Sequence, residues 1–434
     1  MSYKANLLAV FDYLHKNSWG AFLKKDFWHT ANTLDTCVDF ILNSSPYWTD
    51  LSKQRQAVQT MIQDSYQYFD TVYREQNDHG HRSRDVWWDD YGWWGVTFTK
   101  IYQNFEALFR GAPAPTITAA DCLDVARKCW TVLGSYSEHA NRTVKPEYKG
   151  PVAGGCWNHP PKPDGEGVQN SVTNELFLVL SARLYKNTND QSILTAVAGQ
   201  YLWFTSWFVD YLQKQAQCPL PGNQQGAFRC LARTQASRLI VAYERPIDPM
   251  NSKYNQGQPP FVDGQLWTAD QGLLLGGLAE VLSLREALAS LPIIRQQDPT
   301  FPKNAKDMIY WGVLGIDWLF DPTSVLHEAP LHGEFRTGYA ADYATGKGVM
   351  MRYLKQAMGA TGLNPDTYIT QNAKAVLNSM SKDYQLAFQW NTRTDTKIGT
   401  NESDVQTKDL RFPPTVQVAG MDALNAGIQL LHNS

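Results

Sequence analysis

The chain has 434 residues, a formal net charge of −3 and 43% hydrophobic residues, a composition typical of a globular protein with a large core. Nucleic acids and anionic membranes require a basic face, and the near-neutral charge and lack of a basic stretch argue against either partner. No apolar run approaches the ~20 residues that a membrane-spanning helix needs.

Apolar residues recur at three- and four-residue spacing along most of the chain, which is the pattern of amphipathic helices. Strand-like alternation is brief and occurs over residues 237–245. The sequence therefore predicts an all-α protein. In chain order the expected helices cover residues 5–16, 33–43, 56–73, 93–110, 121–136, 168–185, 193–213, 267–284, 304–320, 346–358, 372–388 and 420–432.

The loops between these helices are rich in Gly, Pro, Asn and Asp, and none has the length or composition of a linker. We therefore expect residues 1–434 to form a single domain. Helical hairpins in this number can stack as an open solenoid or close as an (α/α)6 barrel, a toroid of six hairpins. We favour the barrel because residues 176–185 and 272–282 are apolar on nearly all sides, as inner helices would be. Gly272, Gly276 and Gly277 would let such helices approach closely.

Aromatic residues are unusually abundant, with 15 Trp, 21 Tyr and 18 Phe. They favour either a large aromatic core or a groove in which flat rings stack on sugars, and composition does not separate the two.

The sequence DVWWDDYGWWG at residues 85–95 places Asp89 and Asp90 side by side between two tryptophan pairs. One interpretation is helix capping, with one Asp as the N-cap and the next in the first turn. The other is catalysis, because a retaining glycosidase needs two carboxylates roughly 5–5.5 Å apart and an inverting one needs roughly 6.5–9.5 Å. Adjacent residues fit the shorter separation better. An apolar setting would also give the two acids unequal proton affinities, and both interpretations can hold together.

The stretch WWDDYGWWGV resembles the signature of glycoside hydrolase family 76, the endo-α-1,6-mannanases. Residues 154–159 and 168–185 resemble that family's Gly-Gly-x-x-Trp loop and Asn-x-x-x-x-Asn-Glu-Leu helix, and residues 266–281 resemble a helix that begins with Asn-Gln-Gly. The resemblance covers residues 87–281 and implies an (α/α)6 fold.

By this resemblance Asp89 would be the nucleophile and Asp90 the acid/base of a retaining mechanism. The implied substrate contacts are Trp88, Tyr91, Trp93, Trp94, Trp157, Asn170, Asn174, Glu175, Asp263 and Gln271. For the aromatic residues the alternative is ordinary barrel core, and for Asn170, Asn174 and Glu175 it is capping and hairpin hydrogen bonding. The chain departs from the family pattern at Asp270, where the family has Asn. It also has GEFRTG at residues 333–338 in place of a late Phe-Lys-Gly, so Arg336 would replace the lysine.

No cofactor or metal is implied. His79 and His81 lack a third ligand at useful spacing, and neither a zinc-protease motif nor a phosphate-binding Gly-Lys-Ser/Thr loop is present. The six cysteines form no C-x-x-C pair and leave the redox state open. The N-terminus lacks the pattern of a signal peptide, so the compartment is open: cytoplasmic, or extracellular if a leader was removed.

The leading hypothesis is a monomeric retaining hydrolase of α-mannan, with a mannan-type polysaccharide or oligosaccharide as its partner. Three alternatives stay open: a transglycosylase with the same chemistry, a non-catalytic glycan-binding barrel, and another (α/α)6 enzyme such as a sugar epimerase.

Overall fold

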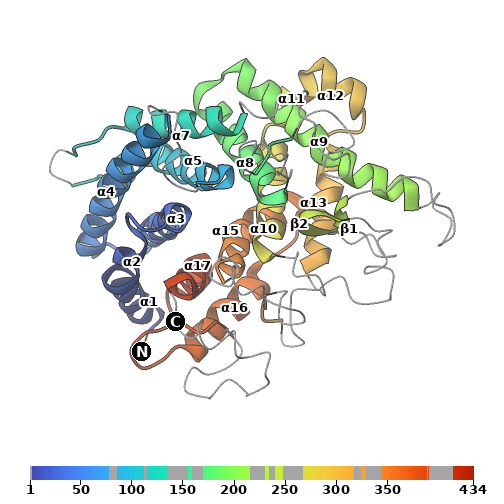
Figure 1. Cartoon of the computed structure of the whole chain (residues 1–434). Helices are drawn as coiled ribbons and strands as arrows, with labels where there is room; N and C mark the ends of the chain where they lie inside the picture. The colour runs from blue at the N-terminus through green and yellow to red at the C-terminus, as the bar shows by residue number, and fades with distance from the viewer. Residues whose placement is uncertain are drawn as a thin grey trace.

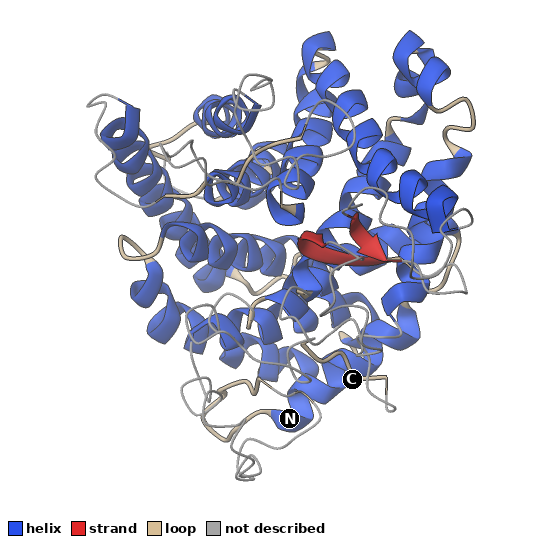
Figure 2. Cartoon of the chain, turned by 45° about the vertical axis from the view of Figure 1, so that its right-hand side comes forward, coloured by secondary structure: helices blue, strands red, loops and turns tan. Residues whose placement is uncertain are grey.

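The computed structural model describes residues 2–77, 86–111, 115–134, 155–158, 170–215, 230–233, 240–247, 267–316, 324–328, 344–388, 390 and 414–434. The all-α prediction is confirmed, with helices drawn throughout the cartoon in Figure 2 and one small ribbon of strands. None of the helices in these ranges is long and apolar enough to cross a membrane.

Six helices form a closed inner ring, which is visible in Figure 1. Each packs against the next, and the last returns to the first, so the prediction of a closed barrel over an open solenoid is confirmed. In ring order they are α3 (Phe27–Ser44), α5 (Trp88–Gln103), α8 (Ser171–Thr188), α10 (Thr268–Ser283), α15 (Gly346–Thr361) and α17 (Pro414–Leu431).

An outer layer of helices packs on this ring, and outer and inner helices alternate along the chain. Its long members are α1 (Tyr3–Tyr13), α4 (Ser52–Asn77), α7 (Ala119–Gly134), α9 (Gln191–Gln215), α13 (Lys303–Gly315) and α16 (Asp366–Ser379). A π-helical turn, η1 (Leu14–Trp19), continues α1 into α2 (Gly20–Phe22). The remaining short helices are α6 (Phe105–Leu108), α11 (Arg285–Ser290) and α12 (Pro292–Gln297).

The predicted strand at residues 237–245 is confirmed as β2 (Val241–Ile247), which pairs antiparallel with β1 (Cys230–Arg233). The ribbon is drawn as red arrows in Figure 2, and β2 packs against α8 and α10. It is therefore an addition to the barrel and lies beside two inner helices.

Glycines allow the inner helices to approach. A Cβ at Gly92 of α5 would lie 2.7 Å from Leu176 of α8, and one at Gly272 of α10 would lie 2.6 Å from the Met350 Cα of α15. Gly276 and Gly277 face Tyr353 and Leu178 in the same way. Any side chain would push the helices apart at these positions, so the predicted role of the glycines in α10 is confirmed.

The N-terminal ends of three inner helices meet at one end of the ring. The indole rings of Trp28, Trp93 and Trp267, from the first two turns of α3 and α5 and the N-cap of α10, pack together with centroid separations of 5.6 to 6.3 Å. We call the end of the barrel where these helices begin the N-terminal end of the ring.

Four cysteines in the described ranges, Cys37, Cys122, Cys129 and Cys156, are buried free thiols. Burial raises the pKa of the Cys122 thiol to about 12, as expected for cysteines that act as small core residues.

Replacing Gly272 by alanine should lower the free energy of unfolding by about 1–3 kcal/mol, because the added methyl group meets the Met350 backbone, which cannot move away. Urea denaturation measures the change. Gly199→Ala is the matched control: Gly199 is an exposed glycine of α9 with open space around it, and alanine should stabilise that helix by about 0.5–1 kcal/mol. Equal changes in the free energy of unfolding for Gly272→Ala and Gly199→Ala would contradict the close approach of α10 and α15 at Gly272.

Candidate functional site

The paired aspartates lie in the first turn of α5. The helix begins at Trp88, so Asp89 and Asp90 are its second and third residues, and Trp87 is the N-cap. An aspartate does cap the helix, as the capping interpretation expected, but neither aspartate is the N-cap residue. Asp90 instead caps from the third helical position: its Oδ2 accepts a hydrogen bond from the Trp87 N–H at 3.0 Å. A third-position acid that satisfies the N-cap amide is the reciprocal half of a capping box.

Adjacent residues leave a helix ~100° apart, so the two carboxyl groups face different surroundings although both are half-buried. Asp90 is directed to the start of its own helix through its bond to Trp87. Asp89 lies close enough to Asp270 of α10 for its charge to raise the Asp270 pKa. The barrel thus gives two neighbouring acids different partners, which is the arrangement that unequal roles require.

The five predicted aromatic contacts are all buried, which is closer to the core interpretation than to an open cleft. Tyr91 and Trp94 pack against Phe27 and Phe69, and the Trp94 indole N–H donates to the Phe27 carbonyl at 3.0 Å. These two rings are held between helices by their neighbours.

Trp93 instead packs with Trp28 and Trp267 at the N-terminal end of the ring. Trp88 and Trp157 are 3% and 2% exposed, and the Trp88 N–H donates to the Asn158 carbonyl at 2.9 Å, so the segment 155–158 is fastened to the start of α5.

Asn170 and Asn174 organise the start of α8. Asn170 is its N-cap and accepts from the Thr173 N–H, as the capping alternative expected. The Asn174 amide exchanges two hydrogen bonds with the backbone of Cys156, at 2.6 and 2.9 Å, and also accepts from Gln200 at 2.8 Å. Asn174 therefore holds segment 155–158 in place, and its role toward a sugar stays a prediction.

Gln271 fastens the β-ribbon to the barrel. Its Oε1 accepts from the Ala242 N–H at 2.8 Å, and its Nε2 donates to the carbonyls of Ile240 and Gly312 at 3.0 and 2.7 Å. Both ends of the Gln271 amide are thus occupied by main chain, and its predicted contact with a sugar stays a prediction. Asp263, the remaining predicted contact, lies outside the described residues, as do His79, His81 and Arg336.

Glu175 of α8 and Asp270 of α10 are the most unusual residues of this end. Both are fully buried, and none of their four carboxyl oxygens has a hydrogen-bond partner among the described residues. Burial, followed by the charge of Asp270, raises the Glu175 pKa well above its ordinary value. Burial and the charges of Glu244, Glu328 and Asp89 do the same for the Asp270 pKa. Burial without donors therefore favours the protonated form of both carboxyl groups.

Two further charged residues were missed from the sequence. Buried Glu328 accepts from the backbone N–H and the hydroxyl of Thr268, at 2.8 and 2.6 Å, and so caps α10 from a distant part of the chain. Lys347, in the first turn of α15, is buried with its ammonium 4.7 Å from the Phe388 ring centre and 4.5 Å from that of Trp390. Burial lowers the Lys347 pKa to about 7, and the charge of Glu328 opposes this shift.

The signal for Lys347 was available in the tripeptide Gly346–Gly348. It places a lysine directly before a glycine at the start of an apolar helix. In the described parts of the chain no cluster of three or more His, Cys, Asp or Glu side chains is arranged to hold a metal ion.

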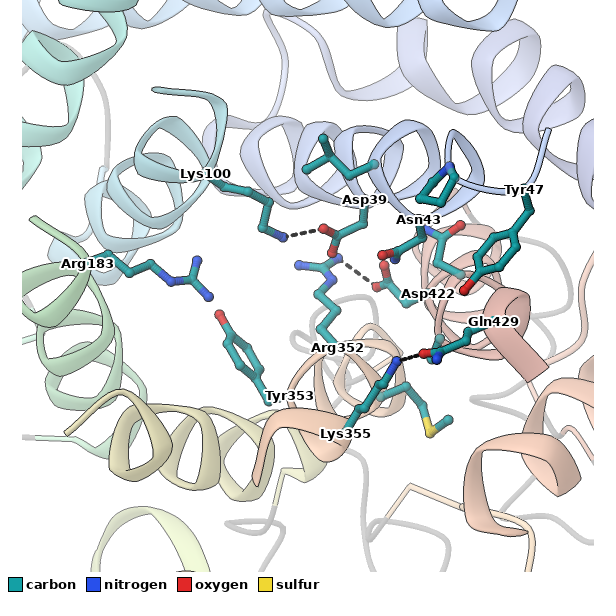
Figure 3. A pocket seen from close by; sticks show the side chains of 15 residues that line it. Asp39, Asn43, Tyr47, Lys100, Arg183, Arg352, Tyr353, Lys355, Asp422 and Gln429 are labelled. Atoms are coloured by element: carbon teal, nitrogen blue, oxygen red, sulfur yellow. Dashed lines mark hydrogen bonds and ion pairs between the residues drawn. The ribbon is translucent and has the colours of Figure 1, made fainter. Parts of the chain in front are cut away.

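The opposite end of the ring is also polar. A cavity of about 340 Å³ is lined mostly by residues from the middle or C-terminal halves of inner helices, and Figure 3 shows its side chains. Arg352 lines this cavity and pairs with Asp35 at 3.0 Å and Asp422 at 2.7 Å, while Lys100 pairs with Asp39 at 2.8 Å. These charges are balanced by ion pairs between helices, in contrast to Glu175 and Asp270 at the N-terminal end.

Solved structures with the same architecture identify the fold. An inactive variant of the α-1,6-mannanase GH76A of Salegentibacter sp. HEL1_6, bound to α-1,6-mannotriose, matches with a TM-score of 0.57 and 15% identity over 97% of this chain and 98% of that one. The family 76 mannosidase Bt3792 of Bacteroides thetaiotaomicron matches with a TM-score of 0.57 and 12% identity over 98% of both chains. The chain has the fold of the family 76 glycoside hydrolases.

The family 76 resemblance stated from the sequence is therefore confirmed at the level of the fold. Lin0763 of Listeria innocua shares this fold as well, with a TM-score of 0.58 and 13% identity over 100% of this chain and 99% of that one. No protein-family profile and no curated protein sequence matches the chain.

Replacing Gln271 by methionine should lower the free energy of unfolding by about 3 kcal/mol, because three buried main-chain groups would lose their partner. Chemical denaturation measures this. Gln429→Met, at an exposed position of α17, should change stability by less than about 0.5 kcal/mol. A Gln271 variant of normal stability that fails only to bind sugars would contradict the structural role.

Lys347 should make stability depend on pH. Its pKa falls from 10.5 to about 7 on folding, so between these values the unfolded state binds more protons and stability rises with pH. Lys347→Met lacks this contribution. The melting temperature of the wild type minus that of the variant should therefore increase from pH 7 to pH 10, by roughly 3 °C for a chain of this size. A constant difference would show that the ammonium keeps its proton.

Proposed function

We propose that this protein is a retaining glycoside hydrolase that cleaves α-mannan, with α-1,6-linked mannan as the substrate. The observation that carries the proposal is the position of Asp89 and Asp90 at the second and third residues of an inner helix, at the end of the ring where the first turns of the inner helices meet.

Retaining cleavage needs one ionised carboxylate and one that carries a proton. Asp89, which faces α10, would attack the anomeric carbon and form a glycosyl ester. Asp90 would protonate the departing glycosidic oxygen and then take a proton from the water that releases the sugar. Both carboxyl groups are half-buried. A substrate could therefore reach them, and their partial removal from water would strengthen electrostatic interactions with it.

The solved structures support this proposal. The Salegentibacter α-1,6-mannanase has this fold, and a variant with two consecutive aspartates replaced by asparagine is described as inactive while it holds α-1,6-mannotriose. The present chain also has two consecutive aspartates, Asp89 and Asp90, which are followed by an apolar helical segment.

The test is incubation with α-1,6-mannan and with mannooligosaccharides, with products analysed by mass and by anomeric configuration. We expect oligosaccharides with the α configuration retained. Asp89→Asn and Asp90→Asn should each reduce turnover by about a thousandfold and leave oligosaccharide binding measurable by calorimetry.

Asp124→Asn is the control, because Asp124 is an exposed acid of α7 that pairs only with the next turn of its own helix, through Lys128. It should keep full activity. Products longer than the starting oligosaccharide would indicate transfer to a sugar acceptor in place of hydrolysis. Binding without turnover in the wild type would support a non-catalytic glycan-binding barrel.

A further inference from the structure

Glu175 and Asp270 raise a problem that the proposed chemistry does not solve. Both side chains have 0% exposure, and their four carboxyl oxygens accept no hydrogen bond. A buried polar group without a partner costs free energy, and a buried ionised one costs far more. Because this cost opposes folding, we look for a role of the two groups in the site.

The surroundings of the pair are acidic. The charge of Asp270 acts on Glu175 of α8, and the charges of Glu244 from β2, Glu328 and Asp89 from α5 act on Asp270. Glu328 already has two hydrogen bonds from Thr268, and Lys347 of α15 is the cation on which its charge acts. Among the described residues, Glu175 and Asp270 have neither a hydrogen-bond donor nor a cation beside them, so burial and the neighbouring negative charge both oppose their ionisation.

We propose that Glu175 and Asp270 are positioning residues that remain protonated together, so that Asp89 is the carboxyl group of the three that carries the negative charge. In this state the starts of α5, α8 and α10 pack without repulsion. When the pair loses protons to solvent at alkaline pH, like charges appear beside Asp89 and between the helix ends, and the site loses its arrangement.

The direction of the pH effect follows from the burial of the pair. A carboxyl group whose pKa is raised by folding contributes most to stability at low pH, and this contribution is lost as pH rises toward its folded pKa. Asparagine and glutamine copy the shape of the protonated acids and cannot ionise. Asp270→Asn and Glu175→Gln should therefore protect the protein specifically at alkaline pH.

The first experiment needs no substrate. Melting temperatures of the wild type, Asp270→Asn and Glu175→Gln are measured from pH 5 to pH 9. The melting temperature of each variant minus that of the wild type should rise by about 3 °C over this range. Glu280→Gln is the control, because Glu280 is a buried acid that pairs with Arg183 and Lys186 and has a lowered pKa, so its variant should show no such alkaline gain.

The second experiment rests on the proposed function and measures the pH profile of α-1,6-mannan cleavage. The alkaline limb of the profile should move up by about one pH unit in Asp270→Asn, a shift that a purely structural role would not produce. Parallel melting curves at every pH would overturn the proposal whether or not the protein is an enzyme. Alkaline protection without any mannan cleavage would uphold the shared protonation and reject the proposed substrate instead.

Discussion

The structure depends on the close approach of six inner helices around one axis. Helices of ordinary side-chain size cannot converge this closely, and the chain meets the constraint by placing glycine where backbones or large side chains from the next helix arrive, as at Gly92, Gly272 and Gly348. Once the ring is closed, the first turns of its helices point into one shared space. Every residue argued to be functional lies there because of this constraint.

Convergence of the helix starts also concentrates charge. The first or second turns of α5, α8 and α10 carry Asp89, Glu175 and Asp270, and three carboxyl groups in a dry interior cannot all ionise. The two ends of the ring differ in the partners of their buried carboxyl groups. At the C-terminal end Asp35, Asp39 and Asp422 each meet an arginine or lysine from a neighbouring helix, whereas Glu175 and Asp270 at the N-terminal end have no such partner among the described residues.

Polar residues near Asp89 divide into two kinds. Asn174 and Gln271 use their amides to hold the segment 155–158 and the β-ribbon against the barrel. They fix the walls of the site, and their hydrogen bonds are complete within the protein. Glu175 and Asp270 have incomplete bonding, which is why electrostatic rather than scaffolding roles follow for them.

The sequence by itself determined the helices, the all-α class and the paired aspartates, because amphipathic periodicity and a motif of adjacent residues are local properties of the chain. It also predicted correctly that glycines of α10 face neighbouring helices. It did not separate Trp93, which faces the ring, from Trp94 and Tyr91, which pack outward, since all three lie within one helical turn.

Only the tertiary structure decided that Gln271 holds a strand, that Lys347 is buried among aromatic rings, and that Asp270 lies with Glu175. These outcomes depend on which distant segments meet, and the cost of burying an amide, an ammonium or a carboxyl group is set by partners far away in the sequence.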